Sequence, residues 1–114
     1  MGLTQETCGG VSGCLFALGL RYGTADPGDR EASARCMQLA NQFCSTARRE
    51  LGSTRCGEIL ERRLGWRIDF LDPSQTRQYF DLGGAQTCTD VVQALVRIAA
   101  GLLEEPPRGE AGER

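Results

Sequence analysis

Six cysteines carry most of the chemistry that this 114-residue chain offers, because it contains no histidine and no lysine. They stand at positions 8, 14, 36, 44, 56 and 88. The absence of histidine excludes Ser-His-Asp catalysis, Cys-His catalysis and Cys₂His₂ zinc sites within the chain, and the absence of lysine excludes Schiff bases and P-loops. No pair has Cys-x-x-Cys spacing, so zinc knuckles, thioredoxin motifs and the usual ferredoxin pattern are unsupported.

Three of the cysteines have a distinctive position. Cys8, Cys56 and Cys88 each fall in the first turn of a predicted helix, next to a glycine or a threonine. Free backbone N–H groups and the positive end of the helix dipole stabilise a thiolate at such a place. We therefore expect these three thiols to ionise readily and to form the functional set.

Glycines accompany two of these cysteines. Each glycine within a helix costs about 1 kcal/mol relative to alanine, so their presence favours a need for close backbone approach. Backbone N–H groups at Gly9, Gly13 and Gly57 would then donate hydrogen bonds to the sulfurs or surround a bound cofactor. In contrast, Cys14, Cys36 and Cys44 occupy apolar helix faces, where a cysteine acts as a small hydrophobic residue.

Apolar periodicity predicts an all-α fold, a small bundle of about four main helices with a short helix or irregular connection. The main helices are expected over 8–22, from 27 or 29 to about 51, over roughly 54–64 with Ser53 as cap, and from Cys88 to about 103. A short helix is expected over 74–80. Residues 1–103 would form one domain, and the Pro-, Gly- and Glu-rich residues 104–114 a disordered tail.

Composition is ordinary for a water-soluble globular protein, with 40% hydrophobic and 25% charged residues. The net charge of −2 gives no reason to expect a nucleic-acid partner. No signal peptide and no membrane-spanning run is visible. We therefore expect a cytoplasmic protein, in which six cysteines are more often reduced, metal-bound or transiently oxidised than locked in disulfides.

Three functions fit helix-start thiols. The first is thiol–disulfide exchange or electron transfer with a partner protein. The second is a metal centre, in which Cys8, Cys56 and Cys88 would hold zinc or an iron–sulfur cluster. The third is a non-catalytic interaction module in which the cysteines only pack. Residue types alone leave all three open.

The run from Cys8 to Gly13, with Leu18 to Gly23 after it, resembles the C_GCAxxG_C_C family of redox-active proteins. Cys56 and Cys88 correspond to two further motif cysteines of that family, and Gly10 stands where the motif has alanine. The resemblance covers nearly the whole chain and implies redox activity. It also implies a fourth cysteine on an upstream helix without a counterpart here, so an N-terminally shortened chain is expected. Apolar surface uncovered in this way would favour a homodimer.

Overall fold

The computed structural model describes residues 1–104, and within that range it contains five α-helices and no strand. The helices are α1 (Gly9–Tyr22), α2 (Arg30–Leu51), α3 (Cys56–Leu64), α4 (Pro73–Asp81) and α5 (Gly84–Leu103). The all-α expectation is confirmed. The four main helices that the sequence predicts correspond to α1, α2, α3 and α5, and the predicted short helix corresponds to α4. Apart from Glu104, the predicted tail lies outside the described residues.

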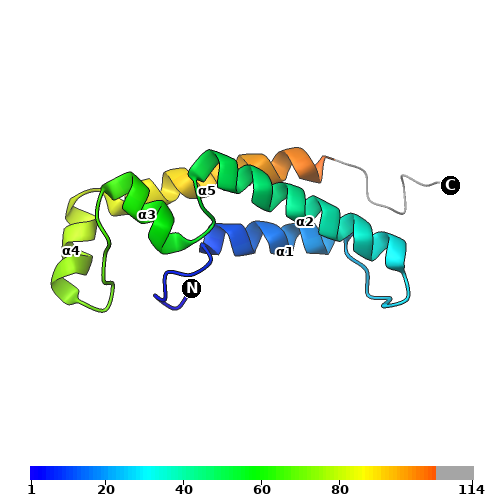
Figure 1. Cartoon of the computed structure of the whole chain (residues 1–114), viewed down its shortest axis with the longest axis horizontal. Helices are drawn as coiled ribbons and strands as arrows, with labels where there is room; N and C mark the ends of the chain where they lie inside the picture. Colours follow the sequence, from blue (N-terminus) through cyan, green and yellow to red (C-terminus); the bar gives the residue numbers. More distant parts are fainter. Residues whose placement is uncertain (105–114) are drawn as a thin grey trace.

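Helices α1, α2 and α5 pack against one another in pairs and run side by side along the molecule (Figure 1). Their apolar faces recur at three- and four-residue spacing, which places one stripe of each helix toward the shared core. The main core cluster contains residues of these three helices and one of α3: Val11, Cys14, Leu18, Tyr22, Leu39, Phe43, Ala47, Leu51, Ile59, Val91, Leu95, Ala99 and Leu102.

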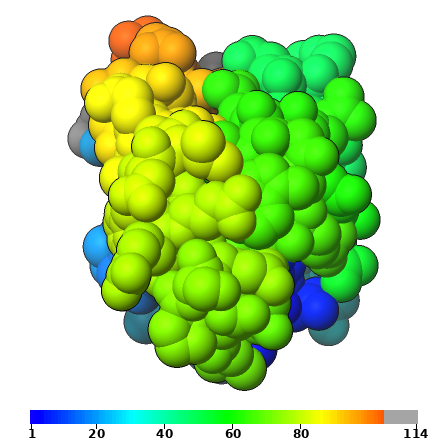
Figure 2. Space-filling view, turned by 90° about the vertical axis from the view of Figure 1, so that its left-hand side faces the viewer, coloured from blue at the N-terminus to red at the C-terminus, as the bar shows by residue number. Residues whose placement is uncertain are grey.

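The short helices α3 and α4 contact the first half of α5 and form one end of the molecule with it (Figure 2). A second, smaller cluster of buried side chains lies there, made of Leu60, Ile68 and Tyr79. Trp66 and Phe70 pack against this cluster. The connection between α3 and α4 is irregular, as expected.

Local chemistry explains several helix ends. The side chain of Asp29 accepts a hydrogen bond of 3.1 Å from the backbone N–H of Ala32 and so caps α2. Gly52 and Gly65 end α2 and α3 in the left-handed region, with φ values of 84° and 87°. Glycine takes that conformation without the steric cost that a Cβ brings, which makes it a common helix stop.

Two predicted helix starts are wrong. The residue before α3 is Arg55, and Ser53 instead accepts a hydrogen bond from the Arg55 N–H and donates one to Glu58. Helix α5 begins at Gly84, not at Cys88, because Gly83 turns the chain with φ 85° and the helix starts at once. Cys88 therefore lies one turn inside α5, not in its first position.

None of the helices within residues 1–104 combines the length and the hydropathy needed to span a membrane.

Candidate thiol site

An N-terminal segment connects the beginnings of α1 and α3. Residues 5–8 run antiparallel to residues 54–57, with a bridge between Thr7 and Arg55. The N–H of Cys8 donates to the carbonyl of Thr54 at 2.9 Å, and the N–H of Cys56 donates to the carbonyl of Glu6. Because Cys8 precedes α1 and Cys56 opens α3, this pairing sets the two cysteines side by side in space, 48 positions apart in sequence.

Cys8, Cys56 and Cys88 line one hollow of about 230 Å³. Helix α5 contributes Cys88, which lies one turn before Val92 on the same wall. The remaining lining is glycine and aliphatic side chain: Gly9, Gly10, Ile59, Leu60, Val91 and Val92. Each of the three thiols is half-buried. The structure therefore brings together the three cysteines that the sequence predicts as a set.

Cys14, Cys36 and Cys44 do not line this hollow. They pack in or against the main core, as predicted. All six cysteines are free thiols in this structure. Burial raises the pKa of the Cys14 thiol, and the nearby Cys8 sulfur raises it further. Cys14 is accordingly a buried core thiol.

The expectation that a helix start makes the thiol ionise readily is wrong for Cys56. Burial raises the pKa of Cys56, and the sulfurs of Cys8 and Cys88 add to the rise because charges of the same sign repel. The N-terminal ammonium group and Arg67 lower it by less. The first N–H groups of α3 are also already used, since Gly57 N–H donates to the carbonyl of Gln5 at 3.1 Å.

The three predicted backbone donors have different places. Gly9 lines the thiol hollow. Gly57 is buried beneath Gln5 and Arg67, and a Cβ on it would approach the Arg67 side chain to 2.7 Å. Gly13 lies away from the three cysteines, in a groove between α1 and α5. A role for these glycines around a bound group stays a prediction.

Tyr79 is a member of the site that sequence reasoning missed. Its hydroxyl donates a 2.9 Å hydrogen bond to the carbonyl of Gly84, and its oxygen also lies 2.9 Å from the Cys88 sulfur. Burial raises the Tyr79 pKa well above its usual range, and the neighbouring Cys88 raises it further. The sequence offered one indication, a tyrosine within a predicted short helix. A buried tyrosine usually has a polar partner for its hydroxyl, but the sequence does not identify that partner.

Three features hold the Tyr79 ring in place. Phe70 and Phe80 meet it edge-on, each with ring centroids 5.0 Å apart. Gly84 lies directly beneath the ring, and a Cβ on Gly84 would overlap the ring carbons. The contact with Phe80 on α4 and the absence of a side chain at Gly84 on α5 therefore place the Tyr79 hydroxyl next to Cys88.

A metal centre has less support from these side-chain positions. Within residues 1–104, no three cysteine, aspartate or glutamate side chains stand close enough to share one metal ion. The zinc and iron–sulfur alternative therefore stays a prediction, and the donor set of a single chain does not fit it as arranged here.

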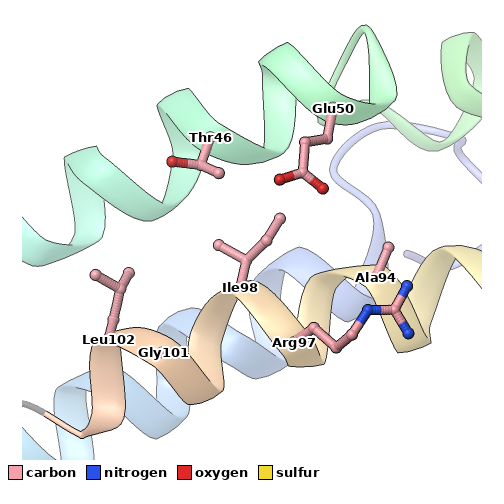
Figure 3. Close-up of a pocket in the computed structure, with 7 residues that line it drawn as sticks. All are labelled: Thr46, Glu50, Ala94, Arg97, Ile98, Gly101 and Leu102. Atoms are coloured by element: carbon pink, nitrogen blue, oxygen red, sulfur yellow. The ribbon is translucent and has the colours of Figure 1, made fainter.

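A larger hollow of about 400 Å³ lies between α2 and α5 (Figure 3). Glu50 and Arg97 stand on its opposite sides, and both are exposed (Figure 3). Its other lining residues are Thr46, Ala94, Ile98, Gly101 and Leu102. None of these lining residues is a cysteine.

Fold and site together define a small helical protein with three thiols gathered in one apolar hollow. Residues 1–102 match the family described as "Putative redox-active protein (C_GCAxxG_C_C)", and the chain belongs to that family. Comparison with curated proteins and with solved structures gave no match.

Proposed function

We propose that the chain carries out thiol–disulfide exchange with a partner protein, using Cys8, Cys56 and Cys88. The observation that carries this proposal is that three separate helices bring these thiols to one hollow of about 230 Å³. The lining supports it as well, because the three half-buried thiols are surrounded by glycine and aliphatic side chains. Membership of a family described as redox-active agrees with this chemistry.

The reaction balances as a two-electron exchange. One thiolate of the site attacks a sulfur of the partner's disulfide, forms a mixed disulfide and releases one partner thiolate. A second cysteine of the site then attacks the site's own sulfur in that mixed bond and releases the second partner thiolate. Two site thiols become one disulfide, the partner disulfide becomes two thiols, and two protons pass from the site to the partner.

Cys56 is suited to the second step. Because burial raises its pKa, Cys56 is mostly protonated at neutral pH and is a poor first nucleophile. Within the mixed disulfide, however, the attacked sulfur is already beside it, and proximity compensates for a low thiolate fraction. We assign the first attack to Cys8 or Cys88 and the resolving step to Cys56.

Serine variants test this function against matched controls. The chain is purified anaerobically, reduced, and mixed with a small disulfide such as oxidised glutathione, and free thiols are counted over time. We expect the loss of two thiols per chain, reversed by a reductant. Cys56→Ser is expected to stop at the mixed disulfide, whereas Cys36→Ser and Cys44→Ser react like the parent chain.

Two results would contradict the proposal. If all thiols stay inert until the chain is denatured, the cysteines only pack, as in an interaction module. If the anaerobically purified chain holds stoichiometric zinc or iron that is lost in the Cys8, Cys56 or Cys88 variants, the site is a metal centre.

We also propose that a second copy of the chain covers the groove between α1 and α5. This groove, of about 300 Å³, is lined almost entirely by small and aliphatic residues: Gly10, Gly13, Cys14, Ala17, Val92, Val96, Ala99, Ala100 and Leu103. Next to it on α1, Phe16 and Leu20 are 69% and 75% exposed. A face that offers both large side chains and small recesses is able to pair with itself about a two-fold axis.

Charge and sequence favour this occupant. Helices α1 and α5 together contain only Arg21, Asp90 and Arg97 as charged residues, so two such faces do not repel. Residues 105–114 contain no aliphatic side chain larger than alanine or proline and five charged ones, which makes them a poor cover for an apolar groove.

Sedimentation of the reduced chain tests the homodimer, with a reductant present to prevent disulfide-linked dimers. We expect a dimer at micromolar concentration and a monomer for Val96→Glu, whose side chain lines the groove. Leu71→Glu is the matched control, since Leu71 is 77% exposed and lies outside the groove. A parent chain that sediments as a monomer would refute the proposal.

A further inference from the structure

The Tyr79 hydroxyl has two neighbours on α5 but only one proton to share. It donates to the carbonyl of Gly84, and its oxygen lies 2.9 Å from the sulfur of Cys88. While the phenol proton points to Gly84, the second hydrogen bond requires the Cys88 thiol as donor and the phenol oxygen as acceptor. In this state both groups are neutral and both are satisfied.

Ionisation of Cys88 reverses the second bond. The thiolate no longer has a proton to donate, and the Tyr79 O–H can turn from Gly84 to the sulfur. Gly84 is not left without a partner, because its carbonyl also accepts the helical i to i+4 hydrogen bond from the Cys88 N–H. A hydrogen bond to a thiolate is charge-assisted and therefore stronger than the neutral bond that it replaces.

We propose that Tyr79 is a positioning residue for Cys88. The Tyr79 hydroxyl holds the Cys88 sulfur at the wall of the thiol hollow and donates a hydrogen bond to that sulfur once Cys88 has ionised. This deepens the proposed thiol–disulfide function and rests on it for the reaction that Cys88 serves. It favours Cys88 over Cys8 as the first nucleophile of the site.

The surroundings support a donor and not a base. Burial raises the Tyr79 pKa well above its usual range, so the phenol keeps its proton and the proton lost by Cys88 passes to solvent water. The ring has little freedom to move, because Phe70 and Phe80 meet it edge-on and Gly84 leaves no room beneath it. A fixed donor costs little entropy when the thiolate forms.

Tyr79→Phe and Tyr22→Phe form a matched pair for the test. Both replace a buried tyrosine whose hydroxyl donates to a carbonyl of α5, Gly84 in one case and Leu102 in the other. The Tyr79 hydroxyl has the Cys88 sulfur as its second neighbour, whereas the carbonyl partner of Tyr22 lies at the other end of α5. A difference between the variants therefore reports on the sulfur contact and not on the loss of a buried hydroxyl.

The readout is the rate at which iodoacetamide alkylates Cys88 in the folded, reduced chain at neutral pH, measured by peptide mass spectrometry. Cys36 in the same sample is the internal reference. We expect Cys88 to react about tenfold more slowly in Tyr79→Phe, as the loss of one charge-assisted hydrogen bond predicts, and at the parent rate in Tyr22→Phe. An equal or faster rate in Tyr79→Phe overturns the proposal.

A second measurement separates donation from packing. The chain has two tyrosines, so Tyr79 is the only one left in Tyr22→Phe. Replacing it biosynthetically with 3-fluorotyrosine keeps the ring and hydroxyl but makes the phenol more acidic and thus a stronger donor. We expect Cys88 alkylation to become severalfold faster; an unchanged rate would show that Tyr79 only packs.

These measurements stand apart from the proposed function, because alkylation requires no disulfide partner. If Cys88 reactivity depends on Tyr79 but no reversible disulfide forms, the exchange function fails and the positioning role holds. If disulfides form equally well in Tyr79→Phe and alkylation is unchanged, the positioning role fails alone.

Discussion

Tyr79 on α4 and Cys88 on α5 share a hydrogen bond of 2.9 Å across the junction of the two helices. Gly83 and Gly84 make this contact possible, because the first turns the chain and the second leaves space for the tyrosine ring. The double glycine therefore has two roles: it begins α5 and it builds part of the thiol site.

Gly84→Ala tests that second role. The added Cβ would overlap the Tyr79 ring, so we expect a loss of about 2 kcal/mol in the free energy of unfolding, as overpacked cores show. Gly101→Ala is the matched control in the same helix, since a Cβ there meets nothing within 4 Å. The control is expected to gain about 0.5–1 kcal/mol from helix propensity. Urea unfolding measures the stability of both variants. Equal stability would contradict the close contact between Gly84 and the Tyr79 ring.

The stability of the fold should decline in alkaline solution. Burial raises the pKa values of Cys14, Cys56 and Tyr79 above those of the unfolded chain. The unfolded chain therefore releases protons first as pH rises, and stability falls above about pH 9, the ordinary pKa of a thiol being 9.0. Urea unfolding at pH 8 and pH 10 measures the fall.

Cys56→Ala provides the check on this pH dependence. It removes one of the groups with a raised pKa, so its stability should fall less between pH 8 and pH 10 than that of the parent chain. The same fall in both proteins would show that Cys56 ionises equally well in the folded and unfolded chains.

Tyr22→Phe should weaken the packing of α1 against the end of α5. The Tyr22 hydroxyl is buried and donates to the Leu102 carbonyl at 2.6 Å. That carbonyl belongs to the last turn of α5, where it also accepts a hydrogen bond from the backbone N–H of Glu104. We expect a loss of about 1–2 kcal/mol, measured by urea unfolding, with the far-ultraviolet circular dichroism of the native state unchanged.

The N-terminal segment should protect Cys56. Glu6 and Gln5 accept the first N–H groups of α3, and the segment covers part of the thiol site. Removal of residues 2–6 is expected to expose Cys56 and to make its alkylation severalfold faster, whereas removal of residues 105–114 is expected to leave it unchanged. An unchanged rate after the first deletion would show that α3 alone buries the thiol.

Local patterns in the sequence predict where the helices lie and separate the cysteines of the thiol hollow from those of the main core. The three- and four-residue spacing of apolar side chains predicts α1, α2 and α5, and Gly52 and Gly65 end α2 and α3 close to the predicted boundaries. The start of α5 was missed because Gly83-Gly84 is typical of a chain break. Here a tertiary contact with Tyr79 uses Gly84 as the first residue of a helix.

The electrostatics of the site depend on contacts that no local pattern contains. A helix start predicts free N–H groups around Cys56, but a segment about fifty residues earlier in the chain accepts their hydrogen bonds. The Tyr79 hydroxyl is likewise a tertiary partner, supplied by a different helix from Cys88. Sequence spacing identifies which thiols belong together, and the packing of the chain decides how each one ionises.

The proposed thiol–disulfide exchange requires that Cys8, Cys56 and Cys88 form disulfide bonds with one another. Mild oxidation of the native, metal-free chain with diamide, followed by alkylation of the remaining thiols and peptide mass spectrometry, measures this directly. We predict one intramolecular disulfide per chain, with both sulfurs drawn from these three cysteines, and alkylated Cys14, Cys36 and Cys44. A disulfide that includes Cys36 or Cys44, or six alkylated thiols after oxidation, would contradict the account.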